Sequence, residues 1–171
     1  RGGDLVHAHV VRDDVDEIAR SISAAMDTAD IVFVTGGLGP TADDLTKEAM
    51  AKVLDSNLIH DSSVEREIRE KFQSLGRIMS DNNLRQCLRP PEAEVIPNHW
   101  GTAPGLRIHR EECFVYLLPG PTSELRPMLE EKVLPELEKK GCLCDQSSWL
   151  QLRTAGLGES TVETRLAPIM E

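Results

Sequence analysis

Residues 31–46 most constrain how this chain can fold. They read Ile-Val-Phe-Val-Thr, then Gly-Gly-Leu-Gly-Pro-Thr, then Ala-Asp-Asp-Leu-Thr. The first four residues are apolar and mostly β-branched or aromatic, which predicts a strand buried on both faces, as in a parallel sheet. A helical pattern starts directly after the glycines. Strand, glycine-rich turn and helix in this order bring turn N–H groups and a helix N-terminus to one point, which favours an anion, most often a phosphate.

Asp43 and Asp44 admit two interpretations. Thr41 can serve as the N-cap of the helix with Asp44 at its third position, so that both acids only cap the helix and interact favourably with its dipole. Alternatively, two carboxylates would repel a phosphate in the turn unless a divalent cation lay between them. Carboxylate plus substrate phosphate is the coordination that Mg²⁺ prefers. The second interpretation predicts a metal-assisted nucleotide or diphosphate site.

Two commoner phosphate motifs fit this loop poorly. A Walker A loop ends in Gly-Lys-Ser/Thr, whereas this loop ends at Thr41, and the nearest lysine, Lys47, is expected well inside the helix. Residues 37–42 do satisfy the dinucleotide pattern G-x-G-x-x-G/A, and Asp61 follows at a plausible distance. We rank that match lower because a dinucleotide fingerprint relies on an uncharged helix start, which the two aspartates contradict.

Composition narrows the classes of partner. The 171 residues suit one α/β domain with a small appendage, and a formal net charge of −10 argues against general binding to nucleic acid or to an anionic membrane. Of the four cysteines only Cys142 and Cys144 are close, and they lack a second ligand pair for zinc. The sequence has neither a signal peptide nor an apolar run of about 18 residues. We therefore expect reduced thiols and a cytoplasmic protein.

The rest of the sequence predicts strands and helices that alternate around residues 31–46. Residues 5–11 read as a strand, and Asp13 or Asp14 would cap a helix after it, so that strand, helix and strand form a right-handed crossover with parallel strands. Capping residues and apolar periodicity predict the other elements: strands at 57–60, 93–96 and 149–154, a hairpin of 106–109 and 113–118, a helix with the capping box Ser62/Glu65, a short helix capped by residues 80–83 that contains Leu84 and Leu88, and a helix with the capping box Ser160/Glu163.

A second strand, glycine-containing turn and helix start occupies residues 114–124. Thr122 or Ser123 would cap this helix, with Pro127 in its first turn, where a missing N–H costs least. Two such turns at the same edge of a parallel sheet would form two walls around one ligand. Residues 97–105 contain two glycines, two prolines and no periodicity, which favours a shaped binding loop, with an ordinary connection as the alternative.

Together these motifs closely resemble the CinA (competence/damage-inducible protein) family. The resemblance is carried by residues 35–46, by residues 80–83 with Gln86, by Asn98 with residues 101–105, and by residues 118–124, and it continues into residues 156–160. It implies an α/β fold, a three-layer α/β/α sandwich with a mostly parallel sheet and a β-hairpin. Residues 1–141 would form a MoaB/MogA-like nucleotide- or molybdopterin-binding domain, and residues 142–171 a linker and the start of a KH-like segment.

The resemblance also implies an activity, a nucleotide pyrophosphatase acting on ADP-ribose. Such a hydrolase of a diphosphate anhydride would need a divalent metal, Mg²⁺ or Co²⁺, aided by K⁺. Its partner would be a small nucleotide substrate, with no nucleic acid or membrane, in a homodimer or homotrimer. Carried over by motif, Thr35, Gly36, Gly37, Gly39 and Thr41 would hold the diphosphate, Asp43 and Asp44 would bind the metal and act in catalysis, and Asn83, Thr102 and Ser123, with Glu124 ranked lower, would line the rest of the cleft.

Departures from the family pattern leave other functions open. The family has a leading strand and helix with Gly-x-Glu-Leu-Leu and Asp-Thr-Asn segments; this sequence shows neither, so we expect that strand and helix to be missing and the activity to depend on them. The chain also has His99-Trp100 where relatives carry Pro-Val, and Thr122 where a proline is usual. One alternative is molybdopterin binding or adenylyl transfer in molybdenum cofactor biosynthesis. Another is a non-catalytic nucleotide-sensing module, because a shared fold is a weak guide to chemistry.

Overall fold

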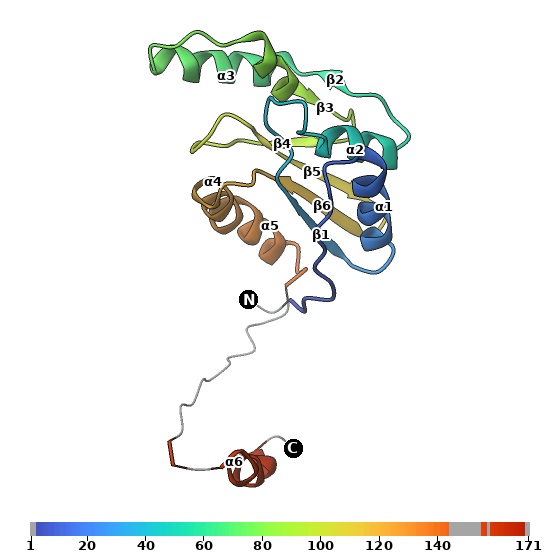
Figure 1. Cartoon of the computed structure of the whole chain (residues 1–171), viewed down its shortest axis with the longest axis vertical. Coiled ribbons are helices and arrows are strands. Elements are labelled where there is room, and N and C mark those ends of the chain that lie inside the picture. Colours follow the sequence, from blue (N-terminus) through green and yellow to red (C-terminus); the bar gives the residue numbers. More distant parts are fainter. Residues whose placement is uncertain (1–2, 144–154, 157, 170–171) are drawn as a thin grey trace. The chain divides into compact units, whose positions relative to one another are not determined.

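The computed structural model describes residues 3–143, 155–156 and 158–169 (Figure 1). Contacts divide the chain into two compact units, one of Gly3–Leu143 and one of Arg1–Gly2 with Cys144–Glu171. In the second unit the described residues form α6 (Glu159–Leu166) and the short 3-10 helix η3 (Ala167–Ile169). No helix among the described residues has the length and apolarity needed to cross a membrane.

A four-stranded mixed sheet forms the centre of the larger unit. Its strands lie in the order β1 (Ile31–Thr35), β6 (Cys113–Leu118), β5 (Gly105–Arg110) and β4 (Glu94–Ile96). β1 and β6 are parallel, whereas the β6–β5 and β5–β4 pairs are antiparallel. The α/β class is therefore confirmed, but parallel pairs are not the majority among the described strands, because β5 enters β6 through a tight hairpin turn rather than a crossover.

Helices cover both faces of this sheet, which gives the three expected layers (Figure 1). One face packs against α1 (Val15–Met26) and α2 (Thr46–Val53), and the other against α4 (Thr122–Met128), the π-helix η2 (Leu129–Val133) and α5 (Leu134–Lys139). β6 shows why: Val115 and Leu117 belong to the first core cluster, and Tyr116 and Leu118 to the second. Both faces of β6 are buried, as its apolar run predicts.

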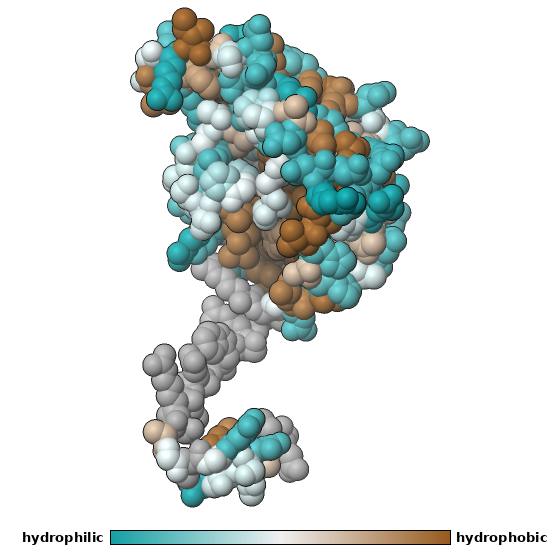
Figure 2. All heavy atoms as spheres, viewed as in Figure 1, coloured by the Kyte–Doolittle hydropathy of each residue, from teal (hydrophilic) through white to brown (hydrophobic). Residues whose placement is uncertain are grey.

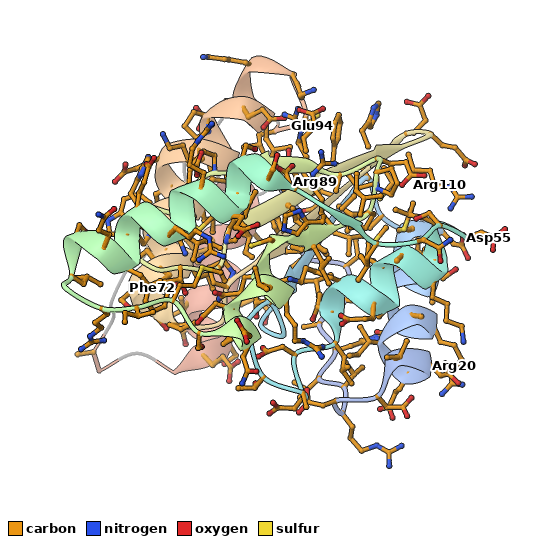
Figure 3. All side chains as sticks on the ribbon, turned by 90° about the horizontal axis from the view of Figure 1, so that it is seen from above. Arg20, Asp55, Phe72, Arg89, Glu94 and Arg110 are labelled. Carbon is orange, nitrogen blue, oxygen red and sulfur yellow. The ribbon has the colours of Figure 1, made fainter. Side chains whose placement is uncertain are left out.

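A smaller layer lies beside β4 and carries part of the candidate site. It contains β2 (Ile59–His60), α3 (Ser62–Ser74), the 3-10 helix η1 (Asp81–Cys87) and β3 (Leu88–Arg89), with β2 and β3 paired antiparallel. Val64, Ile68, Met79 and Cys87 form its core. Arg89 donates to Asp61, and this ion pair ties β3 to the start of α3. Figure 3 shows Arg89 near that end of the helix.

The strand expected at residues 5–11 is not formed, so the expected parallel crossover from it is wrong. These residues have no regular secondary structure, and Leu5 and Val10 are exposed. An alternating pattern makes a strand only where a neighbouring strand can accept its hydrogen bonds, and no described strand pairs with this segment. Among the described strands β1 pairs only with β6, and Phe33 is 44% exposed. Figure 2 shows apolar residues gathered in the region where Figure 1 labels β1 and α5.

Several expected helix starts are displaced by a few residues. Asp14 caps α1 as predicted, by accepting from the N–H of Glu17. The cap of α3 is Asp61 rather than Ser62, since its carboxylate accepts from the N–H groups of Ser63 and Val64. α6 begins at Glu159, after Gly158, so Ser160 is not its cap. Leu88 lies in β3 rather than in the short helix before it. Pro127 lies inside α4 rather than in its first turn.

Two expected caps are not formed: no side chain caps η1, and α4 follows Pro121 without a cap from Thr122 or Ser123. The other local predictions are confirmed, apart from one that lies outside the described residues. The strands expected at 57–60 and 93–96 appear as β2 and β4, and the hairpin appears as β5 and β6. Glu111 in its turn has φ +54°, which helps to make the connection tight. The strand expected at residues 149–154 lies outside the described part of the chain.

Candidate functional site

The two glycine-containing turns adjoin at one edge of the sheet. The N–H of Gly36, just after β1, donates to the carbonyl of Leu118 at the end of β6, over 2.9 Å. A Cβ added to Gly120, in the second turn, would lie 3.4 Å from the Cα of Gly36. Because β1 and β6 are parallel, both turns leave the carboxyl ends of their strands together. This confirms the prediction that the two turns are neighbours.

The first turn folds back onto the start of α2. Gly36 and Gly37 have φ values of +89° and +67°, which favour glycine. The hydroxyl of Thr46 donates to the carbonyl of Gly36 over 2.8 Å, and the N–H of Thr46 donates to the carbonyl of Gly37. A Cβ on Gly37 would lie 2.2 Å from the Thr46 hydroxyl oxygen. Gly37 is therefore required by the close approach of Thr46, whereas a Cβ on Gly36 would meet no atom and only the positive φ favours glycine there.

Asp44 shapes this loop from inside. Its Oδ2 accepts from the N–H and the hydroxyl of Thr41, over 2.8 and 2.5 Å, and a Cβ on Gly39 would lie 2.5 Å from the same oxygen. Burial works to raise the pKa of Asp44, but the hydrogen bonds from Thr41 and from the Gly39 N–H outweigh it and hold that pKa below its ordinary value. Asp44 is therefore ionised at neutral pH.

The capping interpretation of Thr41 and Asp44 is wrong in its geometry. α2 begins at Thr46, its N-cap position is Leu45, and no side chain caps it. Thr41 donates to Asp44 instead of accepting from the helix. Asp43 is exposed and makes no hydrogen bond or ion pair with any described residue. The two aspartates thus differ, since Asp44 holds the loop and Asp43 is free to engage a ligand.

Lys47 is a buried cation that the sequence does not identify. Because α2 starts at Thr46, Lys47 lies in its first turn rather than well inside the helix, and it is only 4% exposed. Its ammonium donates to the carbonyl of Arg85 in η1. Burial lowers the pKa of Lys47 to about 8, with the nearby Glu48 opposing the shift and the Arg85 guanidinium adding to it. The sequence offers no signal for this burial beyond the closeness of Lys47 to the glycine loop.

Arg85 connects the glycine loop with η1. Its guanidinium donates to the carbonyl of Asp44 over 3.2 Å and to Glu48 over 2.8 Å. On the same 3-10 helix, Asn83 donates to the side chain of Gln86 over 3.1 Å, and Gln86 donates to the hydroxyl of Thr102 over 3.1 Å. Contacts from η1 therefore reach both the glycine loop and residues 97–104.

Residues 97–104 are held by buried side chains, as expected for a shaped loop. The amide nitrogen of Asn98, which is 3% exposed, donates to the carbonyl of Ala103 and to Glu124. A Cβ on Gly101 would lie 1.8 Å from the Glu124 Oε2. Since Glu124 follows the second turn directly, this loop adjoins that turn. The sequence marks Asn98 only as a motif residue, and the structure gives it a specific role.

The structure brings together most of the residues carried over by motif, and leaves some of them apart. Gly36, Gly37 and Gly39 lie on one loop with the aspartates, and Glu124 lies on the adjoining turn. Asn83 and Thr102 are joined through Gln86. Among the described residues, neither makes a side-chain hydrogen bond to the aspartates, and Arg85 of the same 3-10 helix provides the link to Asp44. Thr35, Thr41 and Ser123 are exposed, and no side chain caps α4.

A divalent cation fits this donor set only together with a ligand. Among the described residues, no three acidic, histidine or cysteine side chains cluster to hold a metal. Asp43 is free, and Asp44 is ionised with one oxygen engaged by Thr41. One or two carboxylates completed by phosphate oxygens and water are typical of Mg²⁺. Asp43 and Asp44 are therefore the residues that would hold the metal when a diphosphate is bound.

Two surface cavities flank the larger unit, and only one adjoins the candidate site. A cavity of about 540 Å³ lies at the end of α1 and the β5–β6 turn, lined in part by Met26, Glu111 and Cys113. Cys113 begins β6, so this cavity is at the opposite end of that strand from the glycine turns. A cavity of about 430 Å³ is lined in part by Lys71, Asn98 and His99. Asn98 connects this second cavity to the second glycine-containing turn, because it donates to Glu124.

Comparison with known proteins places the chain in a family. Residues 1–139 match the family model described as probable molybdopterin binding domain. The chain is 39% identical over 171 residues to a putative competence-damage inducible protein of Acetivibrio thermocellus, and 40% identical to a CinA-like protein of Desulfovibrio desulfuricans. Each alignment covers 99% of this chain but only 41% and 39% of the relative. The chain thus spans about two fifths of the length of these curated relatives.

A solved structure agrees with this placement. The crystal structure of CinA from Thermoplasma acidophilum, a protein described as having unknown function, matches with a TM-score of 0.64 and 34% sequence identity. The match covers 75% of this chain and 72% of that one. The motifs of the glycine turns, the fold and these relatives all indicate the same family. The chain belongs to the CinA family and contains its probable molybdopterin-binding domain.

Proposed function

We propose that this domain is a metal-dependent nucleotide pyrophosphatase and that its substrate is ADP-ribose. The observation that carries the proposal is the meeting of two glycine-containing turns at the carboxyl ends of β1 and β6, next to an ionised Asp44 and a free Asp43. Ligands of open α/β sheets bind outside the carboxyl ends of the strands. Main-chain donors with adjacent carboxylates suit a diphosphate that arrives with a divalent cation.

The chain's own residues would divide the work between binding and proton transfer. The N–H groups of the glycine loop and the start of α2 would bind the diphosphate oxygens, because no side chain caps α2. A bound divalent cation would neutralise phosphate charge and lower the pKa of a water that it holds. Asp43 would accept a proton from the attacking water. The water oxygen bonds to one phosphorus, and the bridging oxygen leaves with the other phosphate, giving AMP and ribose 5-phosphate.

Two other functions are alternatives. The description of the matched family favours molybdopterin binding, with adenylyl transfer to that ligand as its catalytic form. The other is a non-catalytic sensing module that regulates an attached domain, because a shared fold is a weak guide to chemistry. Both alternatives would use the same glycine turns as an anion site. They differ from the first proposal in turnover, since neither requires release of AMP from ADP-ribose.

The test is an assay of AMP release from ADP-ribose in the presence of Mg²⁺ or Co²⁺, with and without K⁺. Asp44→Asn keeps a side-chain acceptor for Thr41 but removes the charge, and Asp43→Ala removes the free carboxylate. We expect both changes to lower turnover by at least roughly tenfold. Asp16→Ala, which removes an exposed carboxylate paired with Lys52 on the outer helices, is the matched control and should leave turnover unchanged.

Three outcomes separate the functions. Metal-dependent AMP release that needs Asp43 and Asp44 supports the pyrophosphatase. Tight binding of ADP-ribose with no product supports the sensing module and contradicts hydrolysis. Adenylylation of molybdopterin by ATP, without any cleavage of ADP-ribose, supports the cofactor-biosynthesis function.

A further inference from the structure

Trp100 is an exposed aromatic residue on an otherwise fixed loop. It is 40% exposed, and it is the single tryptophan among the described residues. Most other large apolar side chains with comparable exposure lie on the irregular segment 3–14, on the edge strand β1 or near the end of α3. Single exposed apolar residues on irregular or edge segments are ordinary. An exposed tryptophan on a loop held by buried side chains needs a different explanation.

Asn98 fixes the backbone on which Trp100 sits. Its side-chain Oδ1 accepts from the N–H groups of both Trp100 and Gly101, over 3.0 Å each. Its side-chain nitrogen donates to the carbonyl of Ala103 and to Glu124. One buried amide therefore holds this turn from within, and all of its hydrogen-bonding groups are engaged there.

Lys71 fixes the same segment from outside. From α3, its ammonium donates to the carbonyl of Asn98 and, over 2.8 Å, to the carbonyl of Gly101. These two carbonyls lie on either side of His99 and Trp100, so Lys71 brackets the pair. Burial lowers the pKa of Lys71, while the nearby carboxylates of Glu67 and Glu124 oppose that shift and favour the charged form. Charge-assisted hydrogen bonds of this kind are stronger than neutral ones.

The bracketed loop adjoins the candidate site through three contacts. Gly101 packs against the carboxylate of Glu124, which follows the second glycine-containing turn. Thr102 accepts from Gln86 of η1. Gly120 of the second turn contacts Gly36 of the first. The loop that carries Trp100 thus adjoins the second turn, which lies next to the loop that would bind the diphosphate.

We propose that Trp100 is a specificity-determining residue that stacks on the planar base of the bound nucleotide, and that Lys71 is the positioning residue that holds Trp100 for this role. The proposal rests on the proposed function, which supplies a diphosphate ligand but no residue for its base. Aromatic stacking recognises any flat heterocycle and discriminates against ligands without one. A backbone that is fixed before binding has less conformational freedom to lose, which favours affinity.

The test measures binding of paired probes, one with a base and one without, in the presence of Mg²⁺. Trp149→Phe leaves Trp100 as the single tryptophan, so that fluorescence reports on it directly. We expect AMP and ADP-ribose to quench this fluorescence. Trp100→Ala lacks this reporter and is measured by calorimetry beside the wild type. It should bind AMP roughly tenfold or more weakly, the usual loss on removing a stacking aromatic, and bind inorganic pyrophosphate unchanged. Trp100→Phe should retain most of the affinity for AMP.

The positioning role of Lys71 is tested with the same probes. Lys71→Met keeps the length of the side chain and removes the donor, so it should weaken AMP binding, leave pyrophosphate binding unchanged and speed amide hydrogen exchange at Trp100 and Gly101. Lys71→Arg should restore part of the affinity. Lys52→Met, which removes an exposed lysine paired with Asp16, is the matched control and should change none of these.

The outcomes distinguish this inference from the function on which it rests. If the wild type and Trp100→Ala bind AMP equally well and also bind pyrophosphate equally well, the stacking role is overturned and the diphosphate site is left intact. An equal loss of both probes in Trp100→Ala shows a structural effect and also overturns it. Failure of the wild type to bind either probe refutes the proposed function and the stacking role together.

Discussion

Replacing Lys47 by methionine should change how stability depends on pH. Lys47 is only 4% exposed in the first turn of α2, and its pKa falls from 10.5 to about 8. Between these two values the unfolded chain binds a proton at Lys47 that the folded protein does not. The stability of the wild type therefore rises as the pH increases through this window. Lys47→Met removes the titrating group, so this rise should be absent from the variant.

The magnitude follows from the two pKa values of Lys47, in the unfolded chain and in the folded protein. Each tenfold change in proton affinity corresponds to roughly 1.4 kcal/mol, so the charged Lys47 costs the folded state roughly 3 kcal/mol near pH 7. Near pH 9.5 the folded form is almost fully neutral, and the remaining cost is roughly 1 kcal/mol. The free energy of unfolding of the wild type relative to Lys47→Met should thus increase by about 2 kcal/mol between these pH values.

Urea denaturation of both proteins at pH 7 and pH 9.5 measures this difference. Lys52→Met is the matched control, because Lys52 is an exposed lysine on the same helix whose side chain is 57% exposed, and it should show no such change. A difference between the wild type and Lys47→Met that is the same at both pH values would show that Lys47 is solvated. In that case the described packing of α2 against η1 would be wrong.

Two further substitutions test the glycine loop and the smaller layer that contains α3. Gly37→Ala places a Cβ 2.2 Å from the Thr46 hydroxyl at φ +67°, so we expect the free energy of unfolding, measured with heat or urea, to fall by roughly 2–4 kcal/mol. Gly141→Ala, at φ +70° with open space around it, is the control and should lose only the roughly 1 kcal/mol of backbone strain. Equal losses in the two variants would contradict the close approach of Thr46. Hydrogen bonds from Ser63 and Arg89 lower the pKa of Asp61, so the ionised Asp61 stabilises the fold above its unfolded pKa and this stabilisation is lost as the pH falls. Asp61→Ala should lower the free energy of urea unfolding by roughly 1–3 kcal/mol at pH 7 and by progressively less below pH 4. A cost that does not change with pH would show that the charge of Asp61 does not stabilise the fold.

Local patterns were enough to predict the centre of the site. The apolar run of β1, the glycines after it and the second strand and turn at β6 are each encoded within about ten residues, and the rule that parallel strands end together places them side by side. The hairpin of β5 and β6 was predicted for the same reason. These features depend on neighbouring residues and on turn chemistry, which a sequence displays directly.

Features that depend on packing between distant segments could not be predicted. Residues 5–11 have the composition of a strand, but a strand needs a partner, and none of the described strands pairs with them. The burial of Lys47 is set by η1, and the contact of Asn98 with Glu124 joins residues 26 positions apart. The starts of α2 and α3 also differ from expectation, since each capping pattern allowed more than one register.

The most direct test of the account is a crystal structure with a non-hydrolysable analogue of ADP-ribose and Mn²⁺, whose anomalous scattering locates the metal. We expect the diphosphate against the glycine loop of residues 36–39 and the start of α2, with the anomalous peak between its oxygens and the carboxylates of Asp43 and Asp44. An analogue bound in the cavity beside Cys113, or a metal peak away from both aspartates, would contradict the account.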